Sequence, residues 1–192
     1  MFLTTGSSAR VHTRIDSLDC FYKFLLSISF AVLTGMCAQI RLQLPFTPVP
    51  VTAQTVAVLL SGIVLGPFFG ALSQVMYLMW GVVGMPWFSG MLGGYLTVLQ
   101  PTFGYILGFI PGAFLAGVIA RQPAVVRSFF IRCAGFYGTT FIIYTFGCAH
   151  LMALLGGNWR LAVSLGVYPF LLVDFFKAAF LAAAMPLFLA GE

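Results

Sequence analysis

The 192-residue chain is 61% apolar, and only 7% of its residues are Asp, Glu, Lys or Arg. A water-soluble domain has about 25% charged residues, and it could not include residues 42–120, which hold no charged residue and no histidine. The net charge of +5 comes from a shortage of acids rather than from a basic patch, which excludes nucleic-acid binding. A mean hydropathy of +1.05 excludes disorder. The composition therefore predicts an integral membrane protein.

Six apolar segments are predicted to cross the bilayer as helices, each of which needs about 20 residues. A polar cytoplasmic tail, residues 1–23, precedes a single six-helix membrane domain, residues 24–190, so the fold class is an all-α membrane bundle. The second and third helices are short and lie close together in the sequence. The predicted spans are 24–40, 52–65, 69–83, 102–120, 133–155 and 165–189.

Proline and glycine mark the connections between these spans. Three prolines fall within residues 45–50, which cannot be helical, because proline lacks a backbone donor and holds the preceding residue extended. Residues 87–101 contain three glycines and several polar side chains, and they are predicted to form an ordered loop or a short re-entrant turn. Residues 156–160 are predicted to form a turn.

The distribution of Lys and Arg predicts the orientation, since short loops rich in these residues stay in the cytoplasm. With the N-terminus inside, the outer loops hold only Arg41 and Arg160. The inner segments hold Arg10, Arg14, Lys23, Arg121, Arg127 and Arg132. Both termini are therefore predicted to lie in the cytoplasm.

Small residues repeat at every fourth position in two spans, a spacing that lets helices pack closely in a membrane. In the fourth span they predict packing against a sister helix of the same chain, and they are Gly104, Gly108, Gly112, Ala116 and Ala120. In the first span the same spacing separates Ala31 from Gly35 and Thr34 from Ala38. Two interpretations of that first-span face are equally good: packing within the chain, or contact with a partner protein.

Motifs for catalysis and for metal binding are missing from the sequence. It has no phosphate-binding G-x-x-x-x-G-K-[ST], no G-x-S-x-G and no H-E-x-x-H, and its His, Cys and carboxylate residues do not cluster at metal-ligand spacing. His150, within the fifth span, is expected to be a hydrogen-bonded core residue rather than a ligand. We therefore predict no catalytic residue, no metal and no cofactor.

Asp174 and Lys177 are the only acid and the only base within a predicted span, and their spacing puts them on one helix face. Asp174 lies about 14 Å from the outer end of a helix that begins at residue 165. Each charge at that depth costs about 2.5–3.5 kcal/mol if it faces lipid. One interpretation is a structural ion pair. The favoured one is a polar ligand site, because a buried pair is a poor source of stability.

Aromatic residues and glycines gather around this pair in the outer half of the predicted bundle. Gly93 and Gly94 allow the backbone to approach a ligand closely, and aromatic side chains form apolar walls. The aromatic residues expected in such a wall are Trp87, Phe88, Tyr95, Tyr105, Tyr168 and Phe170. A belt of interfacial aromatic residues explains Trp87, Trp159 and Tyr168 equally well.

Several short motifs follow one another between about residues 31 and 190. They are PFTPVPVTAQT at 45–55, VLLSG at 58–62, LGP at 65–67, GMPWF at 84–88, Gly93-Gly94, PTFGYILGF at 101–109 and the Asp174-x-x-Lys177 pair. In these motifs the chain resembles the BioY family, the biotin-specific S components of energy-coupling-factor (ECF) transporters. The resemblance implies a six-helix S component of the bacterial inner membrane. Such a protein binds biotin in a pocket that opens to the outside and is capped by the first outer loop, here residues 44–50.

The resemblance also implies roles for individual residues. Asp174 would accept hydrogen bonds from the ureido N–H groups of biotin, and Lys177 would serve either the ureido carbonyl or the carboxylate. Further ligand contacts are expected at Phe46, Thr47, Gln54 and Asn158.

Partner contact in this family uses small residues of the first helix, which Ala31 and Gly35 match only loosely. Two partners are compatible with the sequence: an ECF energising module, consisting of a transmembrane T subunit and ATPases, or further copies of the chain. Two other functions stay open as well. They are a secondary transporter for another small vitamin-like carboxylate, which usually shows internal repeats that are missing here, and a structural membrane subunit.

Overall fold

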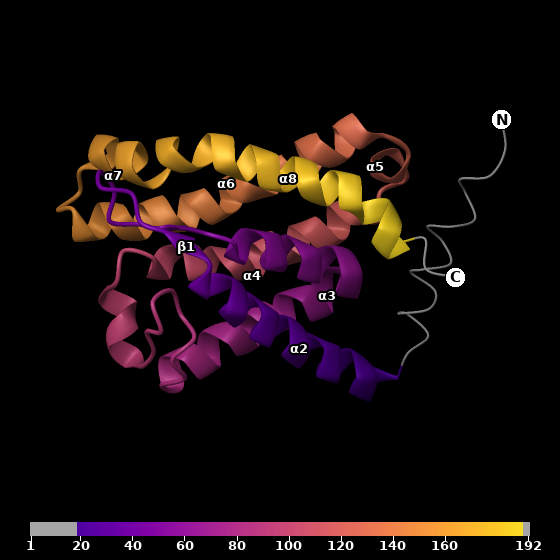
Figure 1. Ribbon diagram of the computed structural model, residues 1–192, viewed down its shortest axis with the longest axis horizontal. Coiled ribbons are helices and arrows are strands. Elements are labelled where there is room, and N and C mark those ends of the chain that lie inside the picture. Colours follow the sequence, from indigo (N-terminus) through magenta and orange to yellow (C-terminus); the bar gives the residue numbers. More distant parts are fainter. Residues whose placement is uncertain (1–18, 190–192) are drawn as a thin grey trace, which may run out of the picture.

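The computed structural model describes residues 19–189, most of which lie in helices (Figure 1). The long helices are α2 (Cys20–Gln39), α3 (Gln54–Val83), α4 (Phe103–Ala120), α6 (Phe129–Leu154) and α8 (Tyr168–Leu189). The shorter elements are β1 (Arg41–Leu42), β2 (Val51–Thr52), the 3-10 helix η1 (Tyr95–Leu99), α5 (Pro123–Arg127) and α7 (Trp159–Gly166). With α7 and α8 counted together, five helical segments of residues 19–189 are long and apolar enough to cross a bilayer.

Helix α3 folds back on itself and so provides two of the predicted spans. Gly66 has a φ of +83°, a left-handed backbone that glycine adopts without strain. Beyond the bend, Gln74 Nε2 donates to Ser61 Oγ at 3.2 Å, although these residues would be about 20 Å apart on one straight helix. The first arm rises only about 18 Å, less than the thickness of the hydrocarbon core. The bundle therefore has about six membrane segments, one of them short.

Helix α4 packs against both α3 and α6 through its glycines. A Cβ on Gly108 would lie 2.9 Å from Ile143 Cα of α6, and a Cβ on Gly117 would meet the backbone of Pro67 in α3. Such close approach is what small residues permit in a membrane bundle. The predicted packing of this glycine face within the chain is confirmed.

The last predicted span is interrupted. Helix α7 precedes α8 and begins at Trp159, because the side chain of Asn158 accepts the N–H of Leu161 at 3.1 Å and so caps the helix. The prediction of a turn over residues 156–160 was therefore wrong for its last two residues. Residue 167 breaks the helix before α8 starts.

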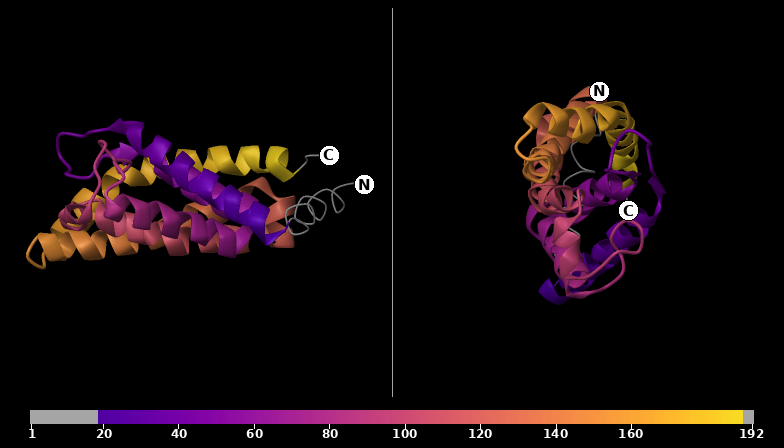
Figure 2. Two further views of the ribbon diagram at one scale, coloured as in Figure 1. Left: turned by 90° about the horizontal axis from the view of Figure 1, so that it is seen from below. Right: turned by 90° about the vertical axis from the view of Figure 1, so that its left-hand side faces the viewer.

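The connections are grouped at the two ends of the bundle (Figures 1 and 2). Residues 40–53, residues 84–102 and α7 lie at one end, whereas α2 begins and α8 finishes at the other. As predicted, neither connection is an α-helix: β1 pairs with β2, and the second connection contains η1. The described chain therefore starts and finishes on the same side, and the assignment of that side to the cytoplasm stays a prediction. Arg10 and Arg14 lie outside the described residues.

Candidate ligand-binding site

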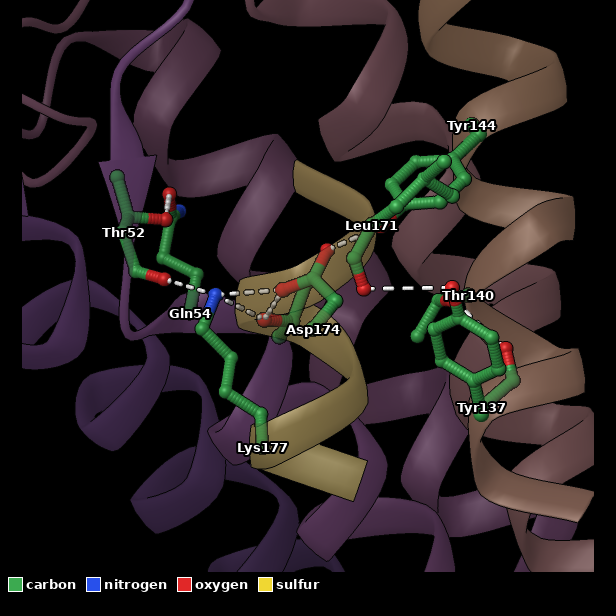
Figure 3. Close-up of polar contacts among 9 residues, drawn as sticks. Thr52, Gln54, Tyr137, Thr140, Tyr144, Leu171, Asp174 and Lys177 are labelled. Atoms are coloured by element: carbon green, nitrogen blue, oxygen red, sulfur yellow. Dashed lines mark hydrogen bonds and ion pairs between the residues drawn. The ribbon is translucent and has the colours of Figure 1, made fainter. Parts of the chain in front are cut away.

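Asp174 and Lys177 form a buried ion pair on α8, with Lys177 Nζ 2.6 Å from Asp174 Oδ1 (Figure 3). Asp174 is only 3% exposed. The pair faces the interior of the bundle, where α3 and α6 supply further polar groups, so neither charge is left to the lipid.

Three side chains satisfy the carboxylate of Asp174. Tyr144 Oη of α6 donates to Oδ2 at 2.6 Å, and Thr55 Oγ1 of α3 donates to Oδ1 at 3.3 Å, next to the Lys177 ammonium. An ionised carboxylate has about four acceptor positions. Asp174 therefore keeps one acceptor position, on the Oδ2 side, for a further donor.

The ammonium of Lys177 is fully engaged within the protein. It donates to the backbone carbonyl of Thr52 at 2.7 Å, to Thr55 Oγ1 at 3.0 Å and to Asp174. An ammonium has three donors, so a ligand oxygen would have to replace one of these acceptors. Thr52 belongs to strand β2, which directly follows the 44–50 loop. The bond from Lys177 therefore links α8 to the end of that loop.

A second hydrogen-bond chain connects the site to the 84–102 connection. Thr52 Oγ1 donates to Gln54 Oε1 at 2.9 Å, and Gln54 Nε2 donates to Tyr77 Oη at 2.8 Å. The indole N–H of Trp87 donates to the backbone carbonyl of Tyr77 at 3.0 Å. The 40–53 and 84–102 connections are thus held together through side chains of α3.

These polar groups line a cavity with about 50 Å³ of water-accessible space. Its polar wall includes Thr52, Gln54, Thr55, Tyr144, Asp174 and Lys177, and its apolar wall includes Val49, Pro50, Ile106, Phe109, Ile143 and Phe170. A mostly apolar cavity on which a small number of polar groups converge is typical of a small-molecule site.

The cavity brings together some of the residues that the sequence singled out. Asp174, Lys177 and Gln54 line it, and so do Tyr105 and Phe170 among the expected aromatic residues. Their role as ligand contacts is a prediction that their position favours.

Other predicted residues lie behind the wall or at the surface. Trp87 and Phe88 pack on Tyr77, with ring centroids 5.2 and 5.3 Å from it, and Gly93 abuts the Met85 carbonyl. Asn158 is used as the cap of α7, and Thr47 bonds a backbone carbonyl outside the cavity. The exposed residues are Phe46, Tyr95 and Tyr168, and Gly94 precedes η1 with a left-handed backbone. None of these residues lines the cavity.

The small residues of α2 face the interior of the chain. Ala31, Thr34 and Ala38 are completely buried, and a Cβ on Gly35 would lie 3.1 Å from the Trp87 ring. This burial favours packing within the chain over contact with a partner, since a partner on α2 would meet its opposite face.

Sequence reasoning missed Tyr144, Thr55 and Ser89, all of which line the cavity. Tyr144 is a neutral polar residue within an apolar span, which was a usable signal because such a hydroxyl needs a partner in a membrane. Thr55 and Ser89 have no comparable signal, since isolated hydroxyls are common in membrane helices and loops.

A mostly helical apolar bundle with a charged pair on the wall of a cavity defines an integral membrane protein with a small-molecule site. The fold is similar to that in the crystal structure of the S-component for biotin from an ECF-type ABC transporter. The TM-score is 0.77 at 19% sequence identity, over 86% of this chain and 89% of that chain. The expected S-component fold is therefore confirmed.

Residues 10–190 match the BioY family, and the chain belongs to that family. It is 37% identical over 150 residues to the "Probable biotin transporter BioY" of Pyrococcus horikoshii, covering 78% of this chain and 85% of the relative. It is 35% identical to the "Biotin transporter BioY" of Thermotoga maritima, covering 71% and 78%. The Rhizobium etli protein of that name is 30% identical, covering 80% and 85%. The resemblance inferred from the motifs is confirmed, and these names describe transporters rather than enzymes.

Proposed function

We propose that this protein binds biotin within the membrane and mediates its uptake. The observation that carries the proposal is the Asp174–Lys177 pair on the wall of a largely apolar cavity, in a chain of the BioY family. Membership of the family supports the substrate, and the geometry supports the place where it binds.

The chemistry of biotin suits the two kinds of wall. Its ureido ring has N–H donors, and Asp174 has one unused acceptor position beside Tyr144. Its thiophane ring and aliphatic chain are apolar and match the side chains of Ile106, Phe109 and Phe170. The ligand thus pairs its donors with a buried carboxylate and leaves its hydrocarbon surface on apolar residues.

Lys177 acts on the ligand and on the 44–50 loop together. If the ureido carbonyl replaces the Thr52 carbonyl as an acceptor, the ammonium keeps three partners and releases strand β2. Ligand binding and the position of the loop are then linked through one side chain. The loop itself is placed to close the cavity, since Val49 and Pro50 line it.

The protein acts in the bacterial inner membrane, with one of two assemblies. It docks onto an ECF energising module or forms homo-oligomers, and in either case the contact uses exposed faces of the helices rather than the buried small residues of α2. Uptake of labelled biotin by cells that make the chain with and without the module distinguishes the two assemblies.

The direct test is retention of radiolabelled biotin by the purified chain in detergent, without any ATPase. We expect stoichiometric retention that unlabelled biotin displaces. An unrelated carboxylate vitamin, such as pantothenate, is the competitor control. Absence of retention, or equal displacement by both vitamins, would contradict the proposed substrate.

A further inference from the structure

Ser89 carries a buried hydroxyl with no hydrogen-bond partner among the described residues. The residue is 9% exposed and lines the same cavity as Asp174 and Lys177. A buried hydroxyl without a partner is costly, and native proteins rarely keep one. The cavity is therefore short of one polar atom, which a bound molecule would supply.

The turn that carries Ser89 is held in a strained conformation. Gly90 and Met91 both have a left-handed backbone, with φ of +84° and +60°, which is uncommon for a residue such as Met91. The side chain of Gln39 fixes this turn: its Oε1 accepts the N–H of Met91 at 3.2 Å, and its Nε2 donates to the Phe88 carbonyl at 3.1 Å. The chain thus maintains the turn that puts Ser89 on the cavity wall.

A guanidinium lies beside this turn. A Cβ on Gly90 would collide with Nη1 of Arg41, so the side chain of Arg41 reaches the residue next to Ser89. Arg41 also lies opposite Thr52 in the β1–β2 pair. Residues opposite each other in an antiparallel pair share one face, and Thr52 lines the cavity. Arg41 itself is exposed and does not line the cavity, so its guanidinium is a cation beside the turn that carries Ser89.

Ser89 and Asp174 lie at different depths in the bundle. Asp174 is about 9 Å along α8 from its outer start at Tyr168. Ser89 belongs to the connection between α3 and α4, at the end of the bundle where α7 lies (Figure 1). The cavity therefore has one polar group around Asp174 and Lys177 and a separate hydroxyl on Ser89, with the Arg41 guanidinium beside the turn that carries it.

We propose that Ser89 and Arg41 receive the carboxylate of the ligand at the outer end of the cavity. The inference rests on the proposed function, because biotin has N–H donors at one end and a carboxylate at the other. The hydroxyl of Ser89 donates to the carboxylate, and the Arg41 guanidinium compensates its charge. A donor facing an ionised acceptor is about twice as strong as one facing a neutral acceptor.

The test compares biotin with biotin methyl ester, which lacks the negative charge, by equilibrium binding to the full-length chain purified in detergent. In the wild type we expect biotin to bind more tightly than the ester. Ser89→Ala and Arg41→Gln should each weaken biotin binding about tenfold, the effect of one hydrogen bond to a charged group. Both should change binding of the ester less than twofold.

Matched controls are Ser164→Ala and Arg160→Gln. Ser164 donates to the Leu161 carbonyl of its own helix, and Arg160 lies over the Trp159 ring, so neither belongs to the cavity. Both should leave the preference for biotin unchanged. Thermal unfolding without ligand gives a second readout: Ser89→Ala should be at least as stable as the wild type, because it removes an unpartnered hydroxyl.

Equal loss of biotin and ester binding in Ser89→Ala or Arg41→Gln, or no loss of either, would overturn the proposal. So would a destabilised Ser89→Ala protein, since that result assigns the hydroxyl a structural role. A wild type that binds both ligands equally would overturn the carboxylate assignment and leave biotin binding intact. A wild type that binds neither ligand would instead contradict the proposed function.

Discussion

The hydroxyl of Thr47 donates a hydrogen bond of 2.7 Å to the backbone carbonyl of Leu165, which is 118 positions away in the sequence. This carbonyl would normally accept the N–H of residue 169, four positions further along a helix. Residue 169 is proline, which has no N–H. The break between α7 and α8 thus creates an acceptor, and the 44–50 loop uses it.

The bond fastens the loop over the cavity. Thr47 Oγ1 also accepts the N–H of Val49 at 3.2 Å, and Val49 lines the cavity wall. The hydroxyl proton of Thr47 is therefore committed to Leu165 while the loop is closed. We infer that the hydroxyl of Thr47 holds the 44–50 loop closed through its hydrogen bond to Leu165. The sequence had suggested that it donates to the ligand.

Thr47→Val should accelerate the release of biotin by at least about three- to tenfold, because it keeps the shape of the side chain but removes both hydrogen bonds of the hydroxyl, to the Leu165 carbonyl and from the Val49 N–H. The measurement is the dissociation rate of labelled biotin from the purified protein. The matched control is Thr145→Val, since Thr145 bonds only its own helix, at the Phe141 carbonyl. A release rate equal to that of the control would show that the bond does not hold the loop.

Pro169→Ala should weaken the same hydrogen bond between Thr47 and the Leu165 carbonyl by changing the surroundings of the acceptor. Alanine restores an N–H that competes with Thr47 for the Leu165 carbonyl and favours continuation of α7 into α8. We expect faster release, and we expect the double variant with Thr47→Val to release biotin no faster than the faster single variant. Additive rate increases would mean that the two residues act independently.

Replacement of Pro45, Pro48 and Pro50 by glycine should also weaken retention of biotin. Prolines restrict the conformations of the open loop, so ordering the loop over a ligand costs less entropy with them than with glycines. The change should appear as a faster dissociation rate with an unchanged thermal unfolding temperature of the ligand-free protein. An unchanged dissociation rate would show that the 44–50 loop is only a connector.

The sequence predicted the bundle well where apolar composition and the positions of glycine and proline between apolar segments decide the structure. Gly66 separates two apolar runs, and it forms the bend between the arms of α3. The break before α8 gave no such signal, because Pro169 lies in the first turn of a helix, where proline is tolerated. Asn158 was ambiguous for a related reason: the same side chain caps a helix or binds a ligand, and only the structure distinguishes these roles.

The candidate site was predictable in its charges but not in its neutral partners. Asp174 and Lys177 were distinctive because charge within an apolar span is expensive. Trp87 was expected in the wall, but its indole N–H donates to the Tyr77 carbonyl and the residue is only 7% exposed, so it supports the wall from behind. Position behind or within a wall depends on side-chain packing between distant segments, which no local pattern encodes.

The closed network around Asp174 leaves two interpretations of the charged pair. Every acceptor of Lys177 and three of the four acceptor positions of Asp174 are supplied by the protein. A purely structural pair would look the same in the absence of a ligand. The two interpretations differ in what happens when both charges are removed together.

The double variant Asp174→Asn/Lys177→Met should fold and insert but lose biotin. Without the two charges, folding no longer carries the free-energy cost of removing them from water. Replacement of a buried ion pair by neutral residues therefore often leaves the stability of a protein unchanged or raises it. Loss of the contacts to the ligand should lower biotin affinity at least tenfold to a hundredfold, corresponding to about 1.5–3 kcal/mol for a charged hydrogen bond.

The single variants serve as the comparison, since each leaves one buried charge without its partner and should lower stability by about 3–5 kcal/mol. Affinity is measured by titration with labelled biotin, and stability by thermal unfolding of the same preparation. Wild-type affinity in a stable double variant would assign the pair a structural role and move the ligand contacts elsewhere in the cavity.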